Sequence, residues 1–334
     1  MLFYRMVPKM LCVLMLLSLS IPVQSSETKV LVIESYHKEF YWDAGYRAGI
    51  SQTLGNRAAI TFFEMDTKRI PKAEFIISAN AAIAKIDELH PDIIMLGDDN
   101  ALTLVGGAVL NRKIPFVFLG INGNPRDYFN RKVVANMTGI LERPLLKRSL
   151  MFVRGINPDW KEVLVLFDDS NTSRIYRDSD FFFSGSNKKK ILGLNVEIFL
   201  SNSYESLQAK VQQAQTDKQV IFLGGLNALR DKHNQYINTD TAISWIYQQS
   251  AIPMFSFWRG TVGKDKSIGG YVIDGFSMGV QAAKQVIDII DEKKSGKLNI
   301  KWLSKGHLVL STAALKRWNI EIPKYLSSTA EYID

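Results

Sequence analysis

Short apolar runs alternate with longer amphipathic stretches along most of the chain. Runs of this length are typical of buried strands, and the longer stretches between them are typical of helices. The predicted strands are residues 30–34, 59–65, 92–96, 115–119, 162–167, 194–200, 220–223 and 253–257. The predicted helices are residues 43–54, 74–89, 100–110, 172–186, 204–215, 239–249 and 274–293, the last with Asp274 as its N-cap. This alternation predicts an α/β protein with parallel sheets covered by helices on both faces.

Three phrases of the first half return in the second half in the same order. The phrase "VLVIES" at 30–35 is echoed by "VLVLFDDS" at 163–170, "LGDDNAL" at 96–102 by "LGGLNAL" at 223–229, and "IPFVF" at 114–118 by "IPMFSF" at 252–257. The repetition predicts two lobes with one architecture, joined tightly by segments near 138–143 and 267–271. Chance similarity between βαβ units is the alternative, and it leaves the strand predictions intact.

The first 25 residues have the pattern of a secretory signal peptide. Arg5 and Lys9 precede an apolar stretch at 10–19, and residues 23–25 stand at the cleavage spacing. An uncleaved anchor is the alternative, although the stretch has only about half of the roughly 20 residues that a spanning helix needs. Cys12 is the only cysteine, so a cleaved chain would have no thiol, which suits an oxidising compartment. We therefore expect a periplasmic protein.

Charge and motifs exclude several classes of function. The formal net charge of +8 becomes +6 when Arg5 and Lys9 are removed, and the one dense basic run, residues 188–190, is predicted to be a solvated helix end or turn. Without basic and aromatic residues interleaved on one face, nucleic-acid binding is not expected. Four isolated histidines predict no metal site. No phosphate loop, nucleophile elbow or zinc-protease motif occurs, so we expect neither a cofactor nor an enzyme.

Polar residues follow most of the predicted strands. Ligands of an open parallel sheet bind beyond the carboxyl ends of its strands, so two such edges facing each other would enclose a polar cleft. Asn100, Asn227 and Ser170 could instead be helix caps. The pairs at 98–99 and 168–169 could serve acid–base chemistry, but adjacent side chains point apart.

Aromatic residues crowd the same edges of the predicted sheets. They favour a clamp on a flat or apolar ligand group, with core packing of Phe40 or Trp42 as the alternative. These residues are Tyr36, Phe40, Tyr41, Trp42 and Trp258.

Longer phrases resemble a known family. They are "VLVIESYH" with "YWDAGYRAGI", "PDIIMLGDDNA", "IPFVFLGINGNP", "NMTGI", "IGGYVIDGFSMGVQAAKQVIDII" and the tail "LVLSTAALKRWNIEIPKYLSSTAEYID". Together they resemble ABC transporter substrate-binding proteins of the tryptophan/tyrosine type, which have the type I periplasmic-binding-protein fold. Departures occur at Trp318-Asn319 and Glu331 in the tail, in the acidic loop at 98–100, and in "NGNP" at 122–125.

The resemblance implies two Rossmann-like parallel-sheet lobes joined by a hinge, 26–140 with 272–300 and 141–271 with 301–334. It implies a monomer that closes around a small molecule, such as an amino acid with an aromatic side chain, and delivers it to the membrane permease of an ABC importer. A sensor that signals to a membrane kinase or cyclase is the main alternative, and a secreted enzyme that uses the aspartates is a third. The residues implied in ligand binding are Ser35, Tyr36, Asp99, Asn100, Asn122, Thr138, Asp168, Ser170, Asn171, Asn227, Trp258 and Asp274.

Overall fold

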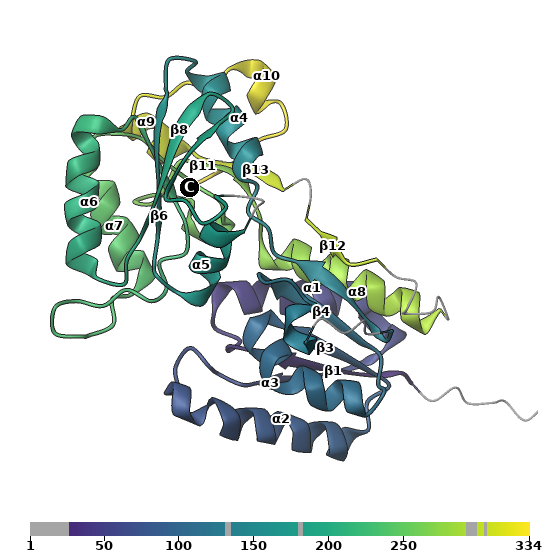
Figure 1. The fold of residues 1–334 in the computed structure, drawn as a ribbon. Helices are drawn as coiled ribbons and strands as arrows, with labels where there is room; N and C mark the ends of the chain where they lie inside the picture. Colours follow the sequence, from purple (N-terminus) through teal and green to yellow (C-terminus); the bar gives the residue numbers. More distant parts are fainter. Residues whose placement is uncertain (1–26, 131–134, 180–182, 292–298, 304–305) are drawn as a thin grey trace, which may run out of the picture.

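The computed structural model describes residues 27–130, 135–179, 183–291, 299–303 and 306–334, which form two α/β lobes (Figure 1). The predicted signal segment lies outside these residues. No helix within the described ranges is both long and apolar enough to cross a membrane. The chain passes from one lobe to the other after β5, between β11 and α8, and between β12 and β13.

A six-stranded parallel sheet forms the centre of the first lobe, in the order β12-β5-β4-β3-β1-β2. Its strands are β1 (Lys29–Glu34), β2 (Ala59–Glu64), β3 (Ile93–Gly97), β4 (Phe116–Ile121), β5 (Met137–Leu141) and β12 (Lys301–Trp302). Its helices are α1 (Tyr41–Leu54), α2 (Phe75–Leu89), α3 (Asp98–Asn111) and α8 (Gly275–Ile290), with short 3-10 turns at Gly55–Arg57, Lys72–Glu74 and Asp127–Phe129.

The second lobe contains a five-stranded sheet in the order β10-β9-β6-β8-β7 and a three-stranded sheet in the order β11-β13-β14. The strands are β6 (Glu162–Phe167), β7 (Lys188–Ile191), β8 (Leu194–Leu200), β9 (Val220–Leu223), β10 (Met254–Ser256), β11 (Gly269–Val272), β13 (His307–Ser311) and β14 (Glu331–Ile333). The helices are α4 (Leu146–Ile156), α5 (Asn171–Asp178), α6 (Tyr204–Asp217), α7 (Thr239–Gln249), α9 (Thr312–Arg317) and α10 (Lys324–Ser327), with a 3-10 turn at Arg259–Thr261.

The predicted duplication of architecture is confirmed by the strand order. The first sheet contains the sequence of neighbours β4-β3-β1-β2, and the second contains β10-β9-β6-β8. Each repeated phrase occupies the same place in both, because β1 corresponds to β6, β3 to β9 and β4 to β10. The division at residue 301 falls beside β12, which pairs with β5 in the first sheet. The exact lobe boundaries remain predictions.

Alternate residues of the central strands pack on opposite faces of each sheet. In the first lobe, Val30 and Val32 of β1 pack in the cluster that contains α1 and α8, while Leu31 and Ile33 pack in the cluster that contains α2 and α3. In the second lobe, β6 divides its side chains between α4 and the pair α6 and α7 in the same way. Burial on both faces explains why these strands read as continuous apolar runs.

Two predictions about the second lobe are wrong. The basic run Lys188–Lys190 is not a helix end or turn but part of the edge strand β7, which pairs antiparallel with β8. Lysines on an exposed edge strand discourage pairing with other chains, and they also hide the apolar pattern of a strand. The helix predicted at 172–186 ends at Asp178, where Ser179 has an extended backbone. Residues 138–143 and 267–271 are also not simple connections, because they overlap β5 and β11.

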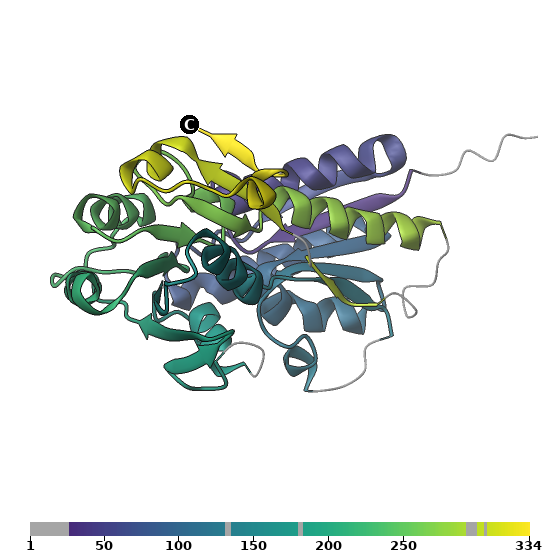
Figure 2. The ribbon, with the colours of Figure 1, turned by 90° about the horizontal axis from the view of Figure 1, so that it is seen from above.

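Helices α1 and α8 lie side by side on one face of the first sheet (Figure 2). Glycines bring the two backbones into contact. A Cβ atom on Gly49 would lie 2.3 Å from the carbonyl oxygen of Phe276, and one on Gly279 would lie 2.2 Å from that of Tyr46. Gly45 and Gly275 are similarly close to the opposite helix. The spacing of four residues in each pair places both glycines on one helix face.

We predict that Gly279→Ala lowers the free energy of unfolding by about 1–3 kcal/mol, because the added methyl group meets a backbone oxygen that cannot move aside. Gly107→Ala in α3 is the matched control. Nothing lies within 4 Å of that Cβ position, so alanine should stabilise the helix by up to about 1 kcal/mol. Urea denaturation measures both. Equal effects of the two substitutions would contradict the close-packing argument.

Candidate functional site

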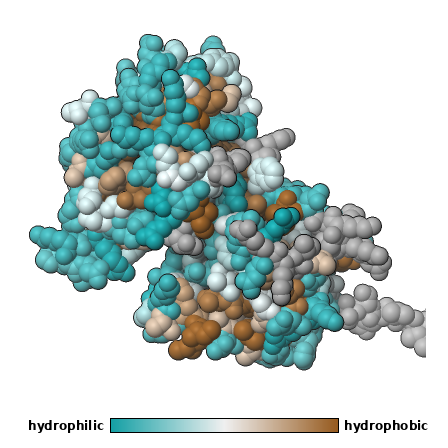
Figure 3. All heavy atoms as spheres, in the orientation of Figure 1, coloured by the Kyte–Doolittle hydropathy of each residue, from teal (hydrophilic) through white to brown (hydrophobic). Residues whose placement is uncertain are grey.

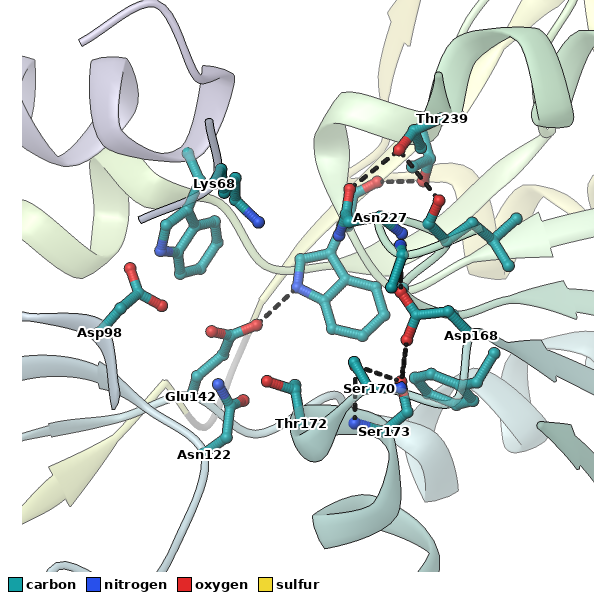
Figure 4. A pocket seen from close by; sticks show the side chains of 18 of the residues that line it. Lys68, Asp98, Asn122, Glu142, Asp168, Ser170, Thr172, Ser173, Asn227 and Thr239 are labelled. Atoms are coloured by element: carbon teal, nitrogen blue, oxygen red, sulfur yellow. Dashed lines mark hydrogen bonds between the residues drawn. The ribbon is translucent and has the colours of Figure 1, made fainter. Parts of the chain in front are cut away.

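The carboxyl ends of strands from both lobes border one pocket of about 190 Å³. Figure 4 shows its side chains converging from the two lobes. The first lobe contributes Tyr36, Phe40, Tyr41, Trp42, Lys68, Asp98, Asn122 and Glu142. The second contributes Phe167, Asp168, Ser170, Thr172, Ser173, Tyr176, residues 224–228, Thr239, Trp258 and Thr261.

Half of the predicted ligand-binding residues line this pocket. They are Tyr36, Asn122, Asp168, Ser170, Asn227 and Trp258. All five aromatic residues that were expected at the strand ends line it as well. Trp42 is also packed in the core, with only 4 % of its surface exposed. This side chain therefore both lines the pocket and belongs to the core, which were the two alternatives for it.

Asp168 holds two loops of the second lobe together. One carboxylate oxygen accepts hydrogen bonds from the backbone N–H groups of Asn227 (2.7 Å) and Ala228 (3.0 Å). The other accepts from the Ser170 N–H (3.1 Å) and the Ser173 hydroxyl (2.7 Å). Because four donors already occupy this carboxylate, Asp168 shapes the pocket wall more than it offers a free acceptor.

The side chain of Asn122 forms hydrogen bonds with residues of both lobes. Its side-chain amide donates to Asp99 at 2.8 Å, and its Oδ1 accepts a hydrogen bond from the hydroxyl of Tyr176 on α5. The Tyr128 hydroxyl also donates to Asp99. Asp99 itself does not line the pocket. Its carboxylate instead holds the side chain of Asn122 in place.

A second bond between the lobes joins Trp258 to Glu142. The indole Nε1–H of Trp258 donates to Glu142 Oε1 at 2.8 Å, and both side chains are buried. Glu142 follows β5, where the chain leaves the first lobe. Arg143 braces this crossing by donating to backbone carbonyls of Ile121 and Asn122. The two bonds between lobes therefore lie at the pocket wall and beside the hinge.

Four other predicted residues do not line this pocket: Ser35, Asn100, Thr138 and Asp274. Ser35 donates to the Gly97 carbonyl (2.6 Å) and accepts from the Ala101 N–H (2.8 Å), so it ties β1 to β3 and α3. Asn100 donates to Thr67 Oγ1 at 2.9 Å. Thr138 is buried within β5. Asn171 is the first residue of α5.

Asp274 is the N-cap of α8, as predicted, and accepts from the Ser277 N–H at 2.6 Å. It lies 3.7 Å from His307 Nε2 and borders two other surface hollows beside the hinge. Its observed contacts are those of a helix cap rather than of a group facing the interlobe pocket.

Among the pocket residues that were not predicted as ligand contacts are Lys68, Asp98, Glu142 and Tyr176. Lys68 follows the second predicted strand and was among the polar strand-end residues, but it was not chosen as a ligand contact. Asp98 precedes Asp99, and the sequence alone does not say which of the two faces the pocket. Glu142 belongs to the crossing segment. Tyr176 lies on a helix of the other lobe, and no local pattern marks it.

Burial dominates the electrostatics of the first lobe's wall. It raises the pKa of Asp98 well above its usual range and the pKa of Glu142 to about 7, although the Trp258 N–H opposes the second shift. Lys68 is an exposed residue, yet desolvation of its ammonium by the surrounding protein lowers its pKa, while the charges of Asp98 and Asp43 oppose this effect. Within the described residues, no group of three or more acidic, histidine or cysteine side chains could hold a metal ion.

Most of the surface in Figure 3 is hydrophilic, and hydrophobic residues gather on the first lobe over α2. Ile76 and Ile77 of α2 are 56 % and 66 % exposed. This patch is remote from the interlobe pocket.

A family model described as "ABC transporter substrate binding protein" matches residues 71–333. No curated protein matches the sequence. Three solved structures share the fold and each covers 92 % of this chain. An ABC domain from Streptococcus pneumonia in complex with L-Trp has a TM-score of 0.66 and 17 % identity, with all of that chain covered.

The other two solved structures are a ligand-free, open substrate binding protein with adhesive properties from Clostridium difficile and a conserved domain protein from Vibrio cholerae. Their TM-scores are 0.67 and 0.61 and their identities are 13 % and 17 %, with 99 % of each chain covered. At such identities the likeness concerns the fold.

We predict that Glu34→Gln flattens the pH dependence of stability. Glu34 is fully buried at the end of β1, and burial raises its pKa from 4.5 to about 8, although Arg47 opposes the shift. The folded chain therefore binds this proton more tightly than the unfolded chain, so the free energy of unfolding falls as pH rises from about 4.5 to about 8.

Urea denaturation at several pH values between 5 and 8 measures this slope. Glu88→Gln in α2 is the control that makes the same chemical change at an exposed carboxyl group. If Glu34→Gln leaves the pH dependence of the free energy of unfolding unchanged, the raised pKa of Glu34 is not its cause.

Proposed function

Because the chain belongs to the ABC transporter substrate-binding protein family, we propose that it is the solute receptor of an ABC importer and that it binds a small molecule in the interlobe pocket. Its fold is the type I periplasmic-binding-protein fold. Proteins of this family bind small molecules, work with ABC permeases and are extracytoplasmic; their general role is binding rather than catalysis. The predicted signal peptide and a periplasmic location fit this role.

The observation that carries the proposal is a pocket whose wall is shared by the two lobes. Trp258–Glu142 and Tyr176–Asn122 join opposite sides of it, and both bonds would break if the lobes moved apart. A ligand that contacts both walls adds to these bonds and favours the closed arrangement. Closure about a hinge then gives the permease a form to recognise.

An amino acid with an aromatic side chain suits the composition of the pocket. The rings of Phe167, Tyr176 and Trp258 lie within 5.7–6.3 Å of one another and form an apolar wall. Thr172 at the start of α5 offers its hydroxyl group to a carboxylate beside the helix N-terminus, whereas the Ser170 hydroxyl caps this helix and bonds to Ser173. The related structure with bound L-Trp supports the same class of ligand.

The volume of about 190 Å³ favours a small metabolite. It is below the roughly 300–1,000 Å³ of pockets that hold drug-sized molecules. Ser35, Thr138 and Asp274 have other contacts and are not needed in this arrangement.

A thermal-shift panel of the mature protein against amino acids, amines, nucleosides, purines, sugars and carboxylic acids tests the proposal. We expect an aromatic amino acid to raise the melting temperature, because a ligand at about 100 times its dissociation constant adds about 2.7 kcal/mol to the free energy of unfolding. A response to another class of compound alone would contradict the proposal that the ligand is an aromatic amino acid. If no compound raises the melting temperature, the proposed function itself is contradicted.

We predict that Trp258→Phe weakens ligand binding about tenfold. The ring remains, but the hydrogen bond to the buried Glu142 carboxylate is lost, and such bonds contribute about 1.5–3 kcal/mol. Trp245→Phe on α7 is the matched control, since Trp245 packs on Tyr204 away from the pocket. Calorimetry with the ligand found by the panel measures both. Equal affinities of the two variants would show that the bond between lobes does not contribute to closure.

A further inference from the structure

The pocket wall carries more acid than base. Its lining includes the carboxylates of Asp98, Glu142 and Asp168 and one ammonium, that of Lys68. The three carboxylates differ in the number of hydrogen bonds that they accept from the protein. Asp168 accepts four hydrogen bonds and Glu142 accepts one from Trp258. Asp98 Oδ2 has no hydrogen-bond partner among the described residues, although only 4 % of Asp98 is exposed.

The backbone around Asp98 is shaped to hold its carboxylate in this position. Asp98 has a φ of +66°, a left-handed conformation that is uncommon for residues other than glycine. Gly120, with a φ of +73°, leaves room beside it, because a Cβ atom there would lie 3.3 Å from Asp98 Oδ1. Strained positions of this kind persist where the surrounding structure enforces them, and they are concentrated at ligand sites. Figure 4 shows Asp98 beside the pocket, near Lys68.

Lys68 places a cation on the aromatic side of the same wall. Its Nζ lies 4.0 Å from the ring centroid of Tyr36 and 4.3 Å from that of Phe40. No ion pair joins Lys68 to a carboxylate of the described residues, so its ammonium rests on the faces of the two rings. Ring faces and carboxylates together form the surroundings in which proteins bind ammonium groups.

We propose that this wall is a subsite for a protonated amine of the ligand, with Asp98 as the counter-ion and Lys68 as a resident cation that competes with the amine. The inference rests on the proposed function and names the side chains that would receive the charged nitrogen of its ligand. Burial raises the pKa of Asp98, and an ammonium that binds beside this side chain favours its charged form. A ligand with a carboxylate and no amine offers no such partner to the unpaired oxygen of Asp98.

Matched sets of probes test the subsite without knowledge of the natural ligand. Each set contains an amino acid, the amine that lacks its carboxylate and the acid that lacks its amine: tryptophan, tryptamine and indole-3-propionate; phenylalanine, phenethylamine and 3-phenylpropionate; tyrosine, tyramine and 3-(4-hydroxyphenyl)propionate. Calorimetry on the mature chain gives the dissociation constants. We expect the deaminated acid of a binding set to be weaker than its amino acid by about tenfold or more.

Two variants assign the roles of the side chains. Asp98→Asn keeps the shape and should weaken every amine-bearing probe about tenfold while leaving the deaminated acid unchanged or tighter. Asp87→Asn on α2 removes the same charge far from the pocket and is its control. Lys68→Met should strengthen amine binding roughly three- to tenfold by removing a like charge, and the exposed Lys38→Met is its control. Melting temperatures show whether each variant is folded.

The outcomes separate this inference from the proposed function. Deaminated acids that bind as tightly as amines, or a folded Asp98→Asn protein with unchanged amine affinity, would overturn the subsite. Weaker amine binding in Lys68→Met would overturn the competing role of Lys68. If no amine in these sets or in the thermal-shift panel binds, the subsite is overturned; the proposed function then stands if a neutral or anionic compound binds and falls with it if nothing binds.

Discussion

The backbone contact between α1 and α8 is the constraint on which the arrangement of the site depends. Gly49 and Gly279 let the two helices approach so closely that a methyl group on either would overlap the other backbone. Helix α8 follows β11 where the chain re-enters the first lobe, and α1 follows the loop that carries Tyr36 and Phe40. The same contact therefore fixes the hinge and the aromatic wall relative to each other. Larger residues at these positions would separate them.

The acidic side chains around the pocket differ in whether their oxygens already accept hydrogen bonds from the protein. Asp168 and Asp99 lie at strand ends, where ligand contacts are expected, but their oxygens already accept bonds from loop N–H groups, Asn122 and Tyr128. Asp98 retains an unpaired oxygen in the same region. In the proposed subsite, this unpaired oxygen is the acceptor for a group that arrives with the ligand.

Much of the fold could be predicted because its strands are buried on both faces. Such strands appear as continuous apolar runs, and the repeated phrases occupy equivalent strands in the two sheets. The predictions were wrong where local composition conceals structure. Lys188–Lys190 form an edge strand whose solvent-facing side chains need not be apolar, and α5 ends eight residues earlier than its predicted limit at Ser186. The short strand β12 depends on its pairing with β5, which its own sequence does not indicate.

The sequence by itself determined the α/β class, the two similar halves and the edge at which polar and aromatic residues gather, since these follow from short-range periodicity. Only the tertiary structure decided which polar residues share the pocket. Asp98 lines it while Asp99 bonds to Asn122 and Tyr128, and Glu142 meets Trp258 across a separation of 116 residues. Side-chain direction depends on local dihedral angles and on the placement of the lobes, and contacts between distant residues fix both.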